Sequence, residues 1–305
     1  MKENHTALRR YILVTPVKNE ERSLPDLIQS VANQTIMPAL WVIVDDGSTD
    51  QTSNIIKESK EKYDWIKSVS LKESPRDLGK HISQVYREGF DFSINYCKVH
   101  EIKYEYIGIA DADIILSTDF FDRLIEKFEK NSKLGLASGG IYYNYNNELI
   151  LEKGREDLPR GGARMFRRKC FEDVGGYSIT YAPDSIANIK AKLRGWEIKQ
   201  FEEIKATQTR RTSTAEGFWK GYWIKGATSY FVNISPCFAM LKSLKYLFNR
   251  PYYIGLAYFW GYFSSFLRKQ ERIDDAEIRE YYHKTKLQEV RRYYFDQLKS
   301  KIKRK

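Results

Sequence analysis

The feature that most constrains the fold of this chain is a regular alternation of apolar runs and helical patterns over its first 140 residues. Apolar runs typical of buried strands lie at residues 11–14, 40–44, 69–71 and 106–110. Segments with apolar residues at helical spacing accompany them, at residues 24–31, 80–92 and 120–128. Strands separated by helices predict βαβ units, and therefore an α/β fold with a parallel sheet.

Polar clusters directly follow three of the expected strands. They occupy residues 15–20, 45–50 and 111–113. The carboxyl ends of parallel strands lie at one edge of a sheet, and ligands bind beyond that edge. The three clusters are therefore expected to converge on one ligand site.

The triplet Asp111-Ala112-Asp113 offers two carboxylates one residue apart. Oxygen ligands of this kind suit Mg²⁺ or Mn²⁺, and such a cation normally also binds substrate phosphates. A cation there would neutralise charge on a departing diphosphate. The alternative is a solvated turn, which becomes much less plausible when the triplet ends a buried strand.

The pair Asp45-Asp46, followed by Gly47-Ser48, also has two interpretations. Asp and Ser favour tight turns and helix caps, and a helix is expected to begin near Thr52. A carboxylate at a strand end can equally accept hydrogen bonds from the base or ribose of a nucleotide. The two roles are compatible.

The pattern changes after about residue 141. Glycine pairs at residues 161–162 and 175–176 indicate loops or close backbone approaches, and residues 184–194 form a helical pattern that ends at Gly195. After Gly217 the composition becomes aromatic and basic. We expect a first domain at residues 1–215 and a helical region at residues 216–305.

The net charge of +11 and the pI near 9.3 indicate an anionic partner. Nucleic acid is not expected, because the chain shows no nucleic-acid motif and its acidic clusters would repel phosphate. Cys97, Cys170 and Cys237 have neither metal-site nor disulfide spacing, and the N-terminus lacks the apolar core of a signal peptide. A cytoplasmic location is expected.

Aromatic residues with basic flanks are concentrated in residues 219–269. This combination is typical of helices that lie in a membrane interface. The longest uncharged stretch, residues 251–267, is too short and too polar for a spanning helix. We expect peripheral attachment to an anionic membrane surface; the alternative is a soluble helical subdomain or an oligomer interface.

Four segments together resemble glycosyltransferase family 2. They read VTPVKNEERSLPDLIQSVANQT from Val14, WVIVDDGSTDQT from Trp41, DAD from Asp111 and GGARMFRRKCFEDVGGY from Gly161. The resemblance implies the GT-A fold, which is Rossmann-like, with a mostly parallel central sheet flanked by helices. It also implies inverting, metal-dependent transfer of a sugar from a nucleotide-diphosphate donor.

The resemblance implies nucleotide contacts near the start of the chain. Thr15, Pro16 and Glu20 match the family's first nucleotide contact and are expected to touch the base. Asp45 and Asp46 match the acidic pair that binds base and ribose.

Further positions match the family's chemistry. Asp111 and Asp113 match its metal and diphosphate motif, and Gly162 matches the segment that lines the sugar and acceptor pocket. The family's catalytic base is often the second acid of a Glu-Asp pair. The matching place here reads Ala182-Pro183-Asp184, so Asp184 is the candidate base.

The family's processive members often carry Q-x-x-R-W. This chain reads QTRRT from Gln208 and lacks the tryptophan, which disfavours a processive synthase. Arg210 is expected to contact the diphosphate, since a guanidinium suits phosphate oxygens; the alternative is a solvated surface arginine.

The expected activity is transfer from a UDP- or GDP-linked sugar, with Mn²⁺ or Mg²⁺, to a glycan or lipid-linked acceptor at the cytoplasmic membrane face. One alternative is a polyprenyl-phosphate glycosyl synthase, whose acceptor is a lipid phosphate. Another is a non-catalytic nucleotide-sugar-binding scaffold. A nucleotidyltransferase is disfavoured, because the loop after the first strand is not glycine-rich.

Overall fold

The computed structural model describes residues 9–72, 80–145, 148–152, 154–209, 217–286, 288–292 and 295. The chain divides into two compact units, Met1–Arg210 and Arg211–Lys305. The domain boundary expected between residues 215 and 216 lies outside the described residues.

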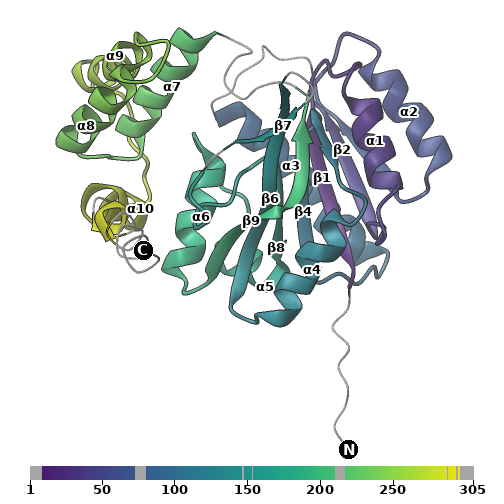
Figure 1. The fold of residues 1–305 in the computed structure, drawn as a ribbon. Coiled ribbons are helices and arrows are strands. Elements are labelled where there is room, and N and C mark those ends of the chain that lie inside the picture. Colours follow the sequence, from purple (N-terminus) through teal and green to yellow (C-terminus); the bar gives the residue numbers. More distant parts are fainter. Residues whose placement is uncertain are drawn as a thin grey trace, which may run out of the picture. The chain divides into compact units, whose positions relative to one another are not determined.

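In its described residues, the first unit contains a nine-stranded sheet (Figure 1). Its strands are β1 (Tyr11–Val17), β2 (Leu40–Asp45), β3 (Ile66–Ser70), β4 (Tyr106–Ala110), β5 (Ile114–Leu116), β6 (Leu134–Tyr145), β7 (Glu148–Leu151), β8 (Ala163–Arg167) and β9 (Glu197–Gln208). Their order is β3-β2-β1-β4-β8-β6-β9-β5, with β7 paired to β6. This is an α/β fold of the kind expected.

The sheet is mixed, which corrects the expectation of a mostly parallel one. Strands β3, β2, β1 and β4 are parallel, as the βαβ pattern predicts. Strand β8 then runs antiparallel to both β4 and β6, while β9 is parallel to β6. The strands beyond β4 are joined by hairpins and long connections, and local periodicity carries no information about their direction.

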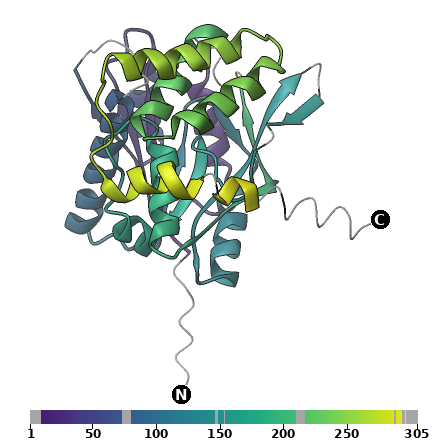
Figure 2. The same ribbon diagram turned by 90° about the vertical axis from the view of Figure 1, so that its left-hand side faces the viewer.

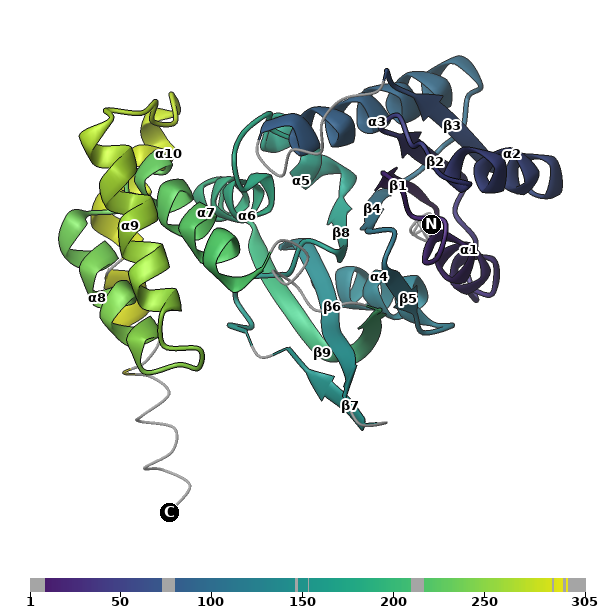
Figure 3. The ribbon, with the colours of Figure 1, turned by 90° about the horizontal axis from the view of Figure 1, so that it is seen from above.

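Helices cover both faces of the sheet. They are α1 (Leu24–Ala32), α2 (Thr52–Lys62), α3 (Lys80–Val99), α4 (Phe120–Lys130), α5 (Arg168–Asp173) and α6 (Pro183–Leu193). Residues of α1, α2 and α4 belong to one buried cluster, and residues of α3, α5 and α6 to the other. Figure 3 shows α1 and α4 on one side of the strands and α3 and α5 on the other.

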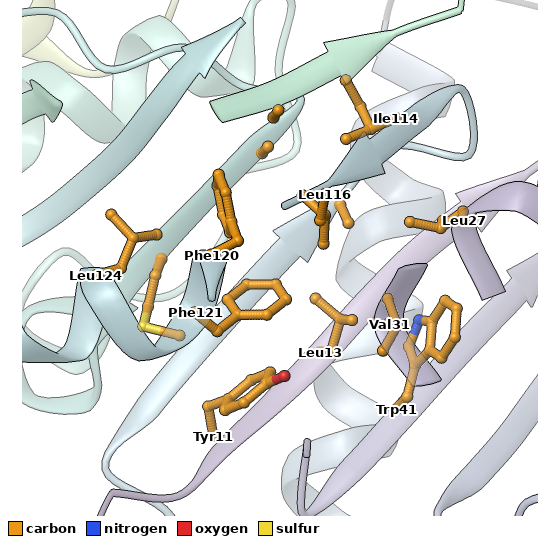
Figure 4. Close-up of a cluster of buried hydrophobic side chains, with 14 of the residues drawn as sticks. Tyr11, Leu13, Leu27, Val31, Trp41, Ile114, Leu116, Phe120, Phe121 and Leu124 are labelled. Carbon is orange, nitrogen blue, oxygen red and sulfur yellow. The ribbon is translucent and has the colours of Figure 1, made fainter. Parts of the chain in front are cut away.

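The first cluster explains why the central strands are apolar throughout. Tyr11, Leu13 and Trp41 point from β1 and β2 toward Phe120 and Phe121 of α4 and the apolar stripe of α1 (Figure 4). The neighbouring residues of both strands face the second cluster, so β1 and β2 are buried along their whole length. This packing holds the carboxyl ends of the strands in place.

The second unit is helical, as expected, and is coloured green to yellow in Figure 2. Its elements are α7 (Phe218–Phe231), α8 (Pro236–Leu247), α9 (Ile254–Leu267), α10 (Ala276–Glu280) and the π-helical turn η1 (Tyr281–Thr285). Helices α7 and α9 pack at glycines: a Cβ on Gly226 would lie 2.0 Å from the Tyr258 carbonyl oxygen, and one on Gly261 2.0 Å from that of Trp223. None of the helices in the described part of the chain is both long and apolar enough to cross a bilayer.

Candidate functional site

The ends of β1, β2 and β4 bring the three polar clusters to one edge of the sheet. Parallel pairing sets Val17 of β1 beside Asp45 of β2 and Val14 beside Ile109 of β4. Asp46 follows β2 directly and Asp111 follows β4 directly. The site is therefore built at the strand ends where the βαβ pattern predicts a ligand.

Asp45 and Asp46 are both nearly buried, and each is fixed by several donors. The Asp45 carboxylate accepts from the Ser48 amide at 2.9 Å and from the Ser53 hydroxyl at 2.6 Å. The Asp46 carboxylate contacts the Lys18 ammonium at 3.4 Å and His81 Nε2 at 2.8 Å. Asp45 therefore shapes the turn into α2, while Asp46 lies between the loop after β1 and the start of α3.

Asp111 is held in an environment that disfavours its charge. Burial raises the pKa of its carboxyl to about 7, and the nearby Asp113 carboxylate raises it further. The Tyr86 hydroxyl of α3 donates a short hydrogen bond to Asp111 Oδ1. Gln208 Nε2 of β9 donates to Asp113 Oδ2 at 3.2 Å. The two carboxylates thus repel each other, and each is oriented by a neutral donor.

Asp111 and Asp113 fit a hard divalent cation, because they supply carboxylate oxygens and a bound cation would relieve their repulsion. Across the described ranges, no group of three His, Cys, Asp or Glu side chains is placed to hold a metal on its own. A cation at this pair would therefore need further oxygen ligands, such as the phosphates of a bound nucleotide.

At Gly161 and Gly162 the backbone passes between two carboxylates, those of Asp111 and Asp184. The amide of Asp111 donates to the Gly162 carbonyl at 2.8 Å, because β8 begins beside the end of β4. A Cβ on Gly162 would lie 2.9 Å from Asp111 Oδ2, and a Cβ on Gly161 would lie 1.9 Å from Asp184 Oδ2. Only glycines let the backbone pass this close to both side chains.

Asp184 opens α6 in a strained turn. Ala182, two residues earlier, has φ 55° and ψ 52°, a left-handed conformation that is unfavourable for a non-glycine residue. Pro183 then sets the first turn of the helix. This local geometry aims the Asp184 carboxylate back toward the glycine pair.

Two buried side chains hold the Asp184 carboxylate. Arg164 of β8 has no exposed surface and forms a short ion pair with Asp184 Oδ1, while the Asp184 side chain keeps 44% of its own surface exposed. The Tyr177 hydroxyl donates to the same oxygen at 2.8 Å. Burial lowers the pKa of Arg164, but the Asp184 carboxylate together with Tyr177 and Tyr86 raises that pKa overall. The Asp184 carboxylate is therefore held on one side by Arg164 and Tyr177 and is accessible on the other.

The tyrosines link the two acidic centres. The rings of Tyr86 and Tyr177 have their centroids 4.9 Å apart, and one hydroxyl bonds Asp111 while the other bonds Asp184. Burial raises the pKa of both phenols, and the carboxylates raise it further. Both tyrosines therefore remain protonated donors at neutral pH.

The remaining expected site residues lie nearby or outside the described part. Thr15 is fully buried in β1, and its hydroxyl accepts from the Trp41 indole at 3.0 Å. Pro16 is also buried within the strand, which continues to Val17 where a loop had been expected. The Glu20 carboxylate accepts from the Ser23 hydroxyl at 2.5 Å, at the start of α1. Arg210 falls outside the described residues.

Sequence reasoning missed Tyr86, Arg164 and Tyr177. Arg164 and Tyr177 lie inside the segment GGARMFRRKCFEDVGGY, yet neither received a role. The available signal was an arginine between apolar residues of a short strand, which is costly to bury unless it is paired. Tyr86 lies on the apolar face of α3, where its sequence context is that of an ordinary core residue.

The chain is similar to curated relatives and to solved structures. The curated relatives include the poly-beta-1,6-N-acetyl-D-glucosamine synthases of Staphylococcus epidermidis, 25% identical over 72% of this chain and 54% of theirs, and of Staphylococcus aureus strain COL, 26% identical over 77% and 57%. This chain therefore spans about half the length of the curated relatives it matches.

Two solved structures share the fold at low sequence identity. Staphylococcus aureus TarS 1-349 in complex with UDP has a TM-score of 0.53 and 14% identity, covering 81% of this chain and 75% of that one. The mannosyltransferase PcManGT from Pyrobaculum calidifontis, in complex with GDP-Man and Mn²⁺, has a TM-score of 0.54 and 14% identity, covering 83% and 69%. These likenesses establish a GT-A-like fold for the chain.

The family model described as glycosyl transferase family 2 matches residues 12–183, the stretch that contains β1, the Asp111 motif and the glycine pair. Since that match spans more than half of the 305 residues, the chain belongs to glycosyltransferase family 2.

Proposed function

We propose that the chain is an inverting, metal-dependent glycosyltransferase that moves a sugar from a nucleotide-diphosphate sugar to an acceptor hydroxyl. The observation that carries this proposal is the placement of Gly161 and Gly162 between the carboxylates of Asp111 and Asp184. A sugar bound against this glycine pair would have a diphosphate-binding centre on one side and a base on the other. That is the arrangement an in-line displacement requires.

The donor half of the site would be formed by the strand ends. Asp45 and Asp46 would bind the base and ribose, and the buried Thr15 and Pro16 would support them from within β1. Glu20 would fix the loop between β1 and α1. The expected diphosphate contact of Arg210 remains part of this proposal.

Asp111 and Asp113 would hold Mn²⁺ or Mg²⁺ together with the donor phosphates. Such a cation, when bound, stabilises the charge on the leaving diphosphate. The chain's own contribution is orientation, since Tyr86 fixes one carboxylate and Gln208 the other. Gly162 leaves room for the sugar beside Asp111.

Asp184 would accept the proton of the acceptor hydroxyl as the acceptor attacks the anomeric carbon. The exposed side of the Asp184 carboxylate would face the acceptor, while Arg164 and Tyr177 hold the carboxylate on its other side. A polyprenyl-phosphate acceptor would arrive already ionised and would need no such base. The elaborate support of Asp184 therefore favours a hydroxyl acceptor.

Donor and acceptor class are proposed by analogy with the relatives. Solved structures with the same fold contain UDP, UDP-GlcNAc or GDP-Man, and the curated relatives are named as polysaccharide synthases. A UDP- or GDP-linked sugar and a glycan or lipid-linked acceptor follow from that analogy. The second unit would attach the enzyme peripherally to the inner face of the cell membrane.

Two exposed apolar stripes support the membrane part of the proposal. The first includes Met240 and Leu244 on α8 and Phe248 directly after it, and the second includes Trp260 and Leu267 on α9; all are exposed. The helices meet at an apolar groove of about 310 Å³. Stripes of this kind, in a basic helical unit, suit an anionic membrane interface. Sedimentation with anionic vesicles tests this, and a chain left in the supernatant at low salt would disprove it.

The central test is thermal stabilisation by nucleoside diphosphates and nucleotide sugars, with and without Mn²⁺, in wild type and in Asp113→Asn. A ligand of the folded state raises the unfolding temperature by mass action. We expect a metal-dependent rise with one nucleotide base, lost in the variant. No rise with any nucleotide would favour a non-catalytic scaffold over an enzyme with this donor.

A further inference from the structure

One row of paired residues crosses the sheet of the first unit and changes from apolar to polar. Val14 of β1 pairs with Ile109 of β4, and Ile109 pairs with Arg164 of β8. Arg164 pairs in turn with Ser138 of β6, and Ser138 with Gln200 of β9. Residues paired across strands face the same side of a sheet, here the side of the second buried cluster, to which Val14 and Ile109 belong. The polar half of the row therefore faces the protein interior.

This polar half, together with one residue of α6, is buried with hydrogen-bonding atoms left over. Arg164 and Ser138 have no exposed surface, Gln200 keeps 2% of its surface exposed and Asn188 of α6 keeps 4%. Both amide atoms of the Gln200 side chain, Oδ1 of Asn188 and Nε of Arg164 have no hydrogen-bond partner among the described residues. Burying such groups unpaired is costly, and folded proteins leave few of them so. These atoms therefore point to a bound ligand.

The loop at residues 156–160, which leads into the glycine pair, ties these buried residues together. Three hydrogen bonds do this: from the Gln200 backbone amide to the Glu156 carbonyl at 2.7 Å, from the Asn188 side chain to the Pro159 carbonyl at 2.9 Å, and from the Arg160 amide to the Ser138 hydroxyl at 3.1 Å. Because the last two bonds hold consecutive residues of the loop, Asn188 and Ser138 lie against the same part of it.

Asn188 also lies directly behind the proposed catalytic base. It follows Asp184 by four residues on α6, and this spacing sets both side chains on one face of the helix. Asp184 meets Arg164 on that face. The unpartnered atoms of Asn188 and Arg164 thus belong to one buried region between α6 and the sheet.

The chemistry of the unpartnered atoms selects water as their ligand. Arg164 Nε and Gln200 Nε2 are donors, whereas Asn188 Oδ1 and Gln200 Oε1 are acceptors. A buried anion would be repelled by the Asp184 carboxylate, and a buried cation by the Arg164 guanidinium. Water both donates and accepts, and a buried water typically makes about three hydrogen bonds to groups of this kind. Its small size also suits side chains that are almost fully enclosed.

We propose that Asn188, Gln200 and Ser138 bind a cluster of ordered waters together with Arg164 Nε, and that this cluster positions Arg164 and the start of α6 behind Asp184. Asn188 and Gln200 are then positioning residues, because they act on Asp184 through water and Arg164. The positioning role rests on the proposed function of Asp184 as the base. The water site itself does not.

A crystal structure of the full chain tests the water site without reference to activity. We expect ordered waters within about 3.2 Å of the Gln200 amide, Asn188 Oδ1 and Arg164 Nε. A direct hydrogen bond between the side chains of Asn188 and Gln200, with no water beside them, would overturn the site.

The unfolding temperature of Gln200→Met gives a second test, because methionine keeps the length of the side chain and removes its polar atoms. The matched control is Gln34→Met, since Gln34 is also buried but donates to the Ser30 and Ser117 carbonyls at 3.1 and 2.7 Å. We expect both variants to unfold about 2 to 6 °C below wild type. A Gln200→Met protein more stable than wild type would show that the amide is buried dry, and would overturn the water site.

Turnover tests the positioning role. We expect kcat of Gln200→Met to fall about 3- to 10-fold at unchanged donor KM, while Gln34→Met keeps the wild-type kcat. Gln200→Asn, which keeps an amide and leaves room for one more water, should recover most of the loss. An unchanged kcat in Gln200→Met, or equal losses in Gln200→Met and Gln200→Asn, would overturn the positioning role.

The outcomes remain separable if one part fails. Should Gln200→Met not fold, the wild-type crystal structure decides the water site and Gln200→Asn the positioning role. Should the chain transfer no sugar from any donor, the proposed function and the positioning role fall together. The crystal structure and the unfolding temperatures would still decide whether the buried row binds water.

Discussion

In the first unit the Asp184 carboxylate lies against the buried guanidinium of Arg164, whereas in the second unit Lys242 lies among three other lysines. The first unit has equal numbers of acidic and basic residues, and its candidate site carboxylates are bound by arginine, lysine, histidine or hydroxyl donors. The second has an excess of 11 positive charges and leaves apolar stripes exposed.

The difference shows which of the two units contains the groups that balance its own charges. The supporting groups of the proposed catalytic centre come from the same unit, on β8, β9 and α3. The helical unit instead presents unbalanced charge and exposed rings, features that a partner of opposite charge and matching polarity would offset. We propose chemistry for the first unit and attachment for the second, and substitutions can test each part.

The largest expected effect follows from Asp184→Asn. An amide cannot accept the acceptor proton, so we expect transfer to fall by about 10²- to 10⁴-fold while nucleotide-induced stabilisation stays close to wild type. The measurement is kcat with the donor identified by the thermal panel. Asp119→Asn, at the half-exposed residue before α4, is the matched control. Near-normal turnover in Asp184→Asn would remove the base from the mechanism.

A graded loss is expected from the residues behind Asp184. Arg164→Lys keeps the positive charge but loses the planar guanidinium and its paired N–H donors. We therefore expect kcat to fall by about 10- to 100-fold. Tyr177→Phe removes one neutral hydrogen bond, and a fall of about 2- to 10-fold is expected. Donor KM should change little in both. If donor KM rises while kcat stays constant, these residues serve donor binding and do not position the base.

Some of these residues could be placed from the sequence and others could not. The strand at residues 106–110 was predicted with its observed ends, and Asp111 and Asp113 lie directly after it as expected. An apolar strand of this kind can be recognised from local sequence, because burial of both its faces makes the apolar run continuous. Arg164 was missed because its meaning depends on the antiparallel insertion of β8 between β4 and β6, which joins segments distant in sequence. Tyr86 and Tyr177 acquire their roles from the same long-range packing.

A smaller effect, on stability, is expected from Asp111→Asn. The pKa of Asp111 lies at about 7 in the folded state and about 3.9 in unfolded chains, so wild type loses stability as pH rises from about 4 to about 7. The variant has no such loss and keeps an oxygen for the Tyr86 hydroxyl. Without ligand, its unfolding temperature should exceed that of wild type by several degrees above pH 7 and by little below pH 4. A variant that is less stable at pH 8 would contradict the cost assigned to this charge.

The smallest expected effect concerns Lys242 in the second unit. The folded-state pKa of about 8 lies below the ordinary value of 10.5, so the folded protein becomes more stable as pH rises from about 8 toward 10.5. Lys242→Gln should therefore unfold at a temperature one or two degrees above wild type at pH 7, with a difference that shrinks by pH 10. A variant less stable than wild type at pH 7 would mean that packing of the lysine stem outweighs charge repulsion. The difference between the two units would then lie in their exposed apolar surface and not in unbalanced charge.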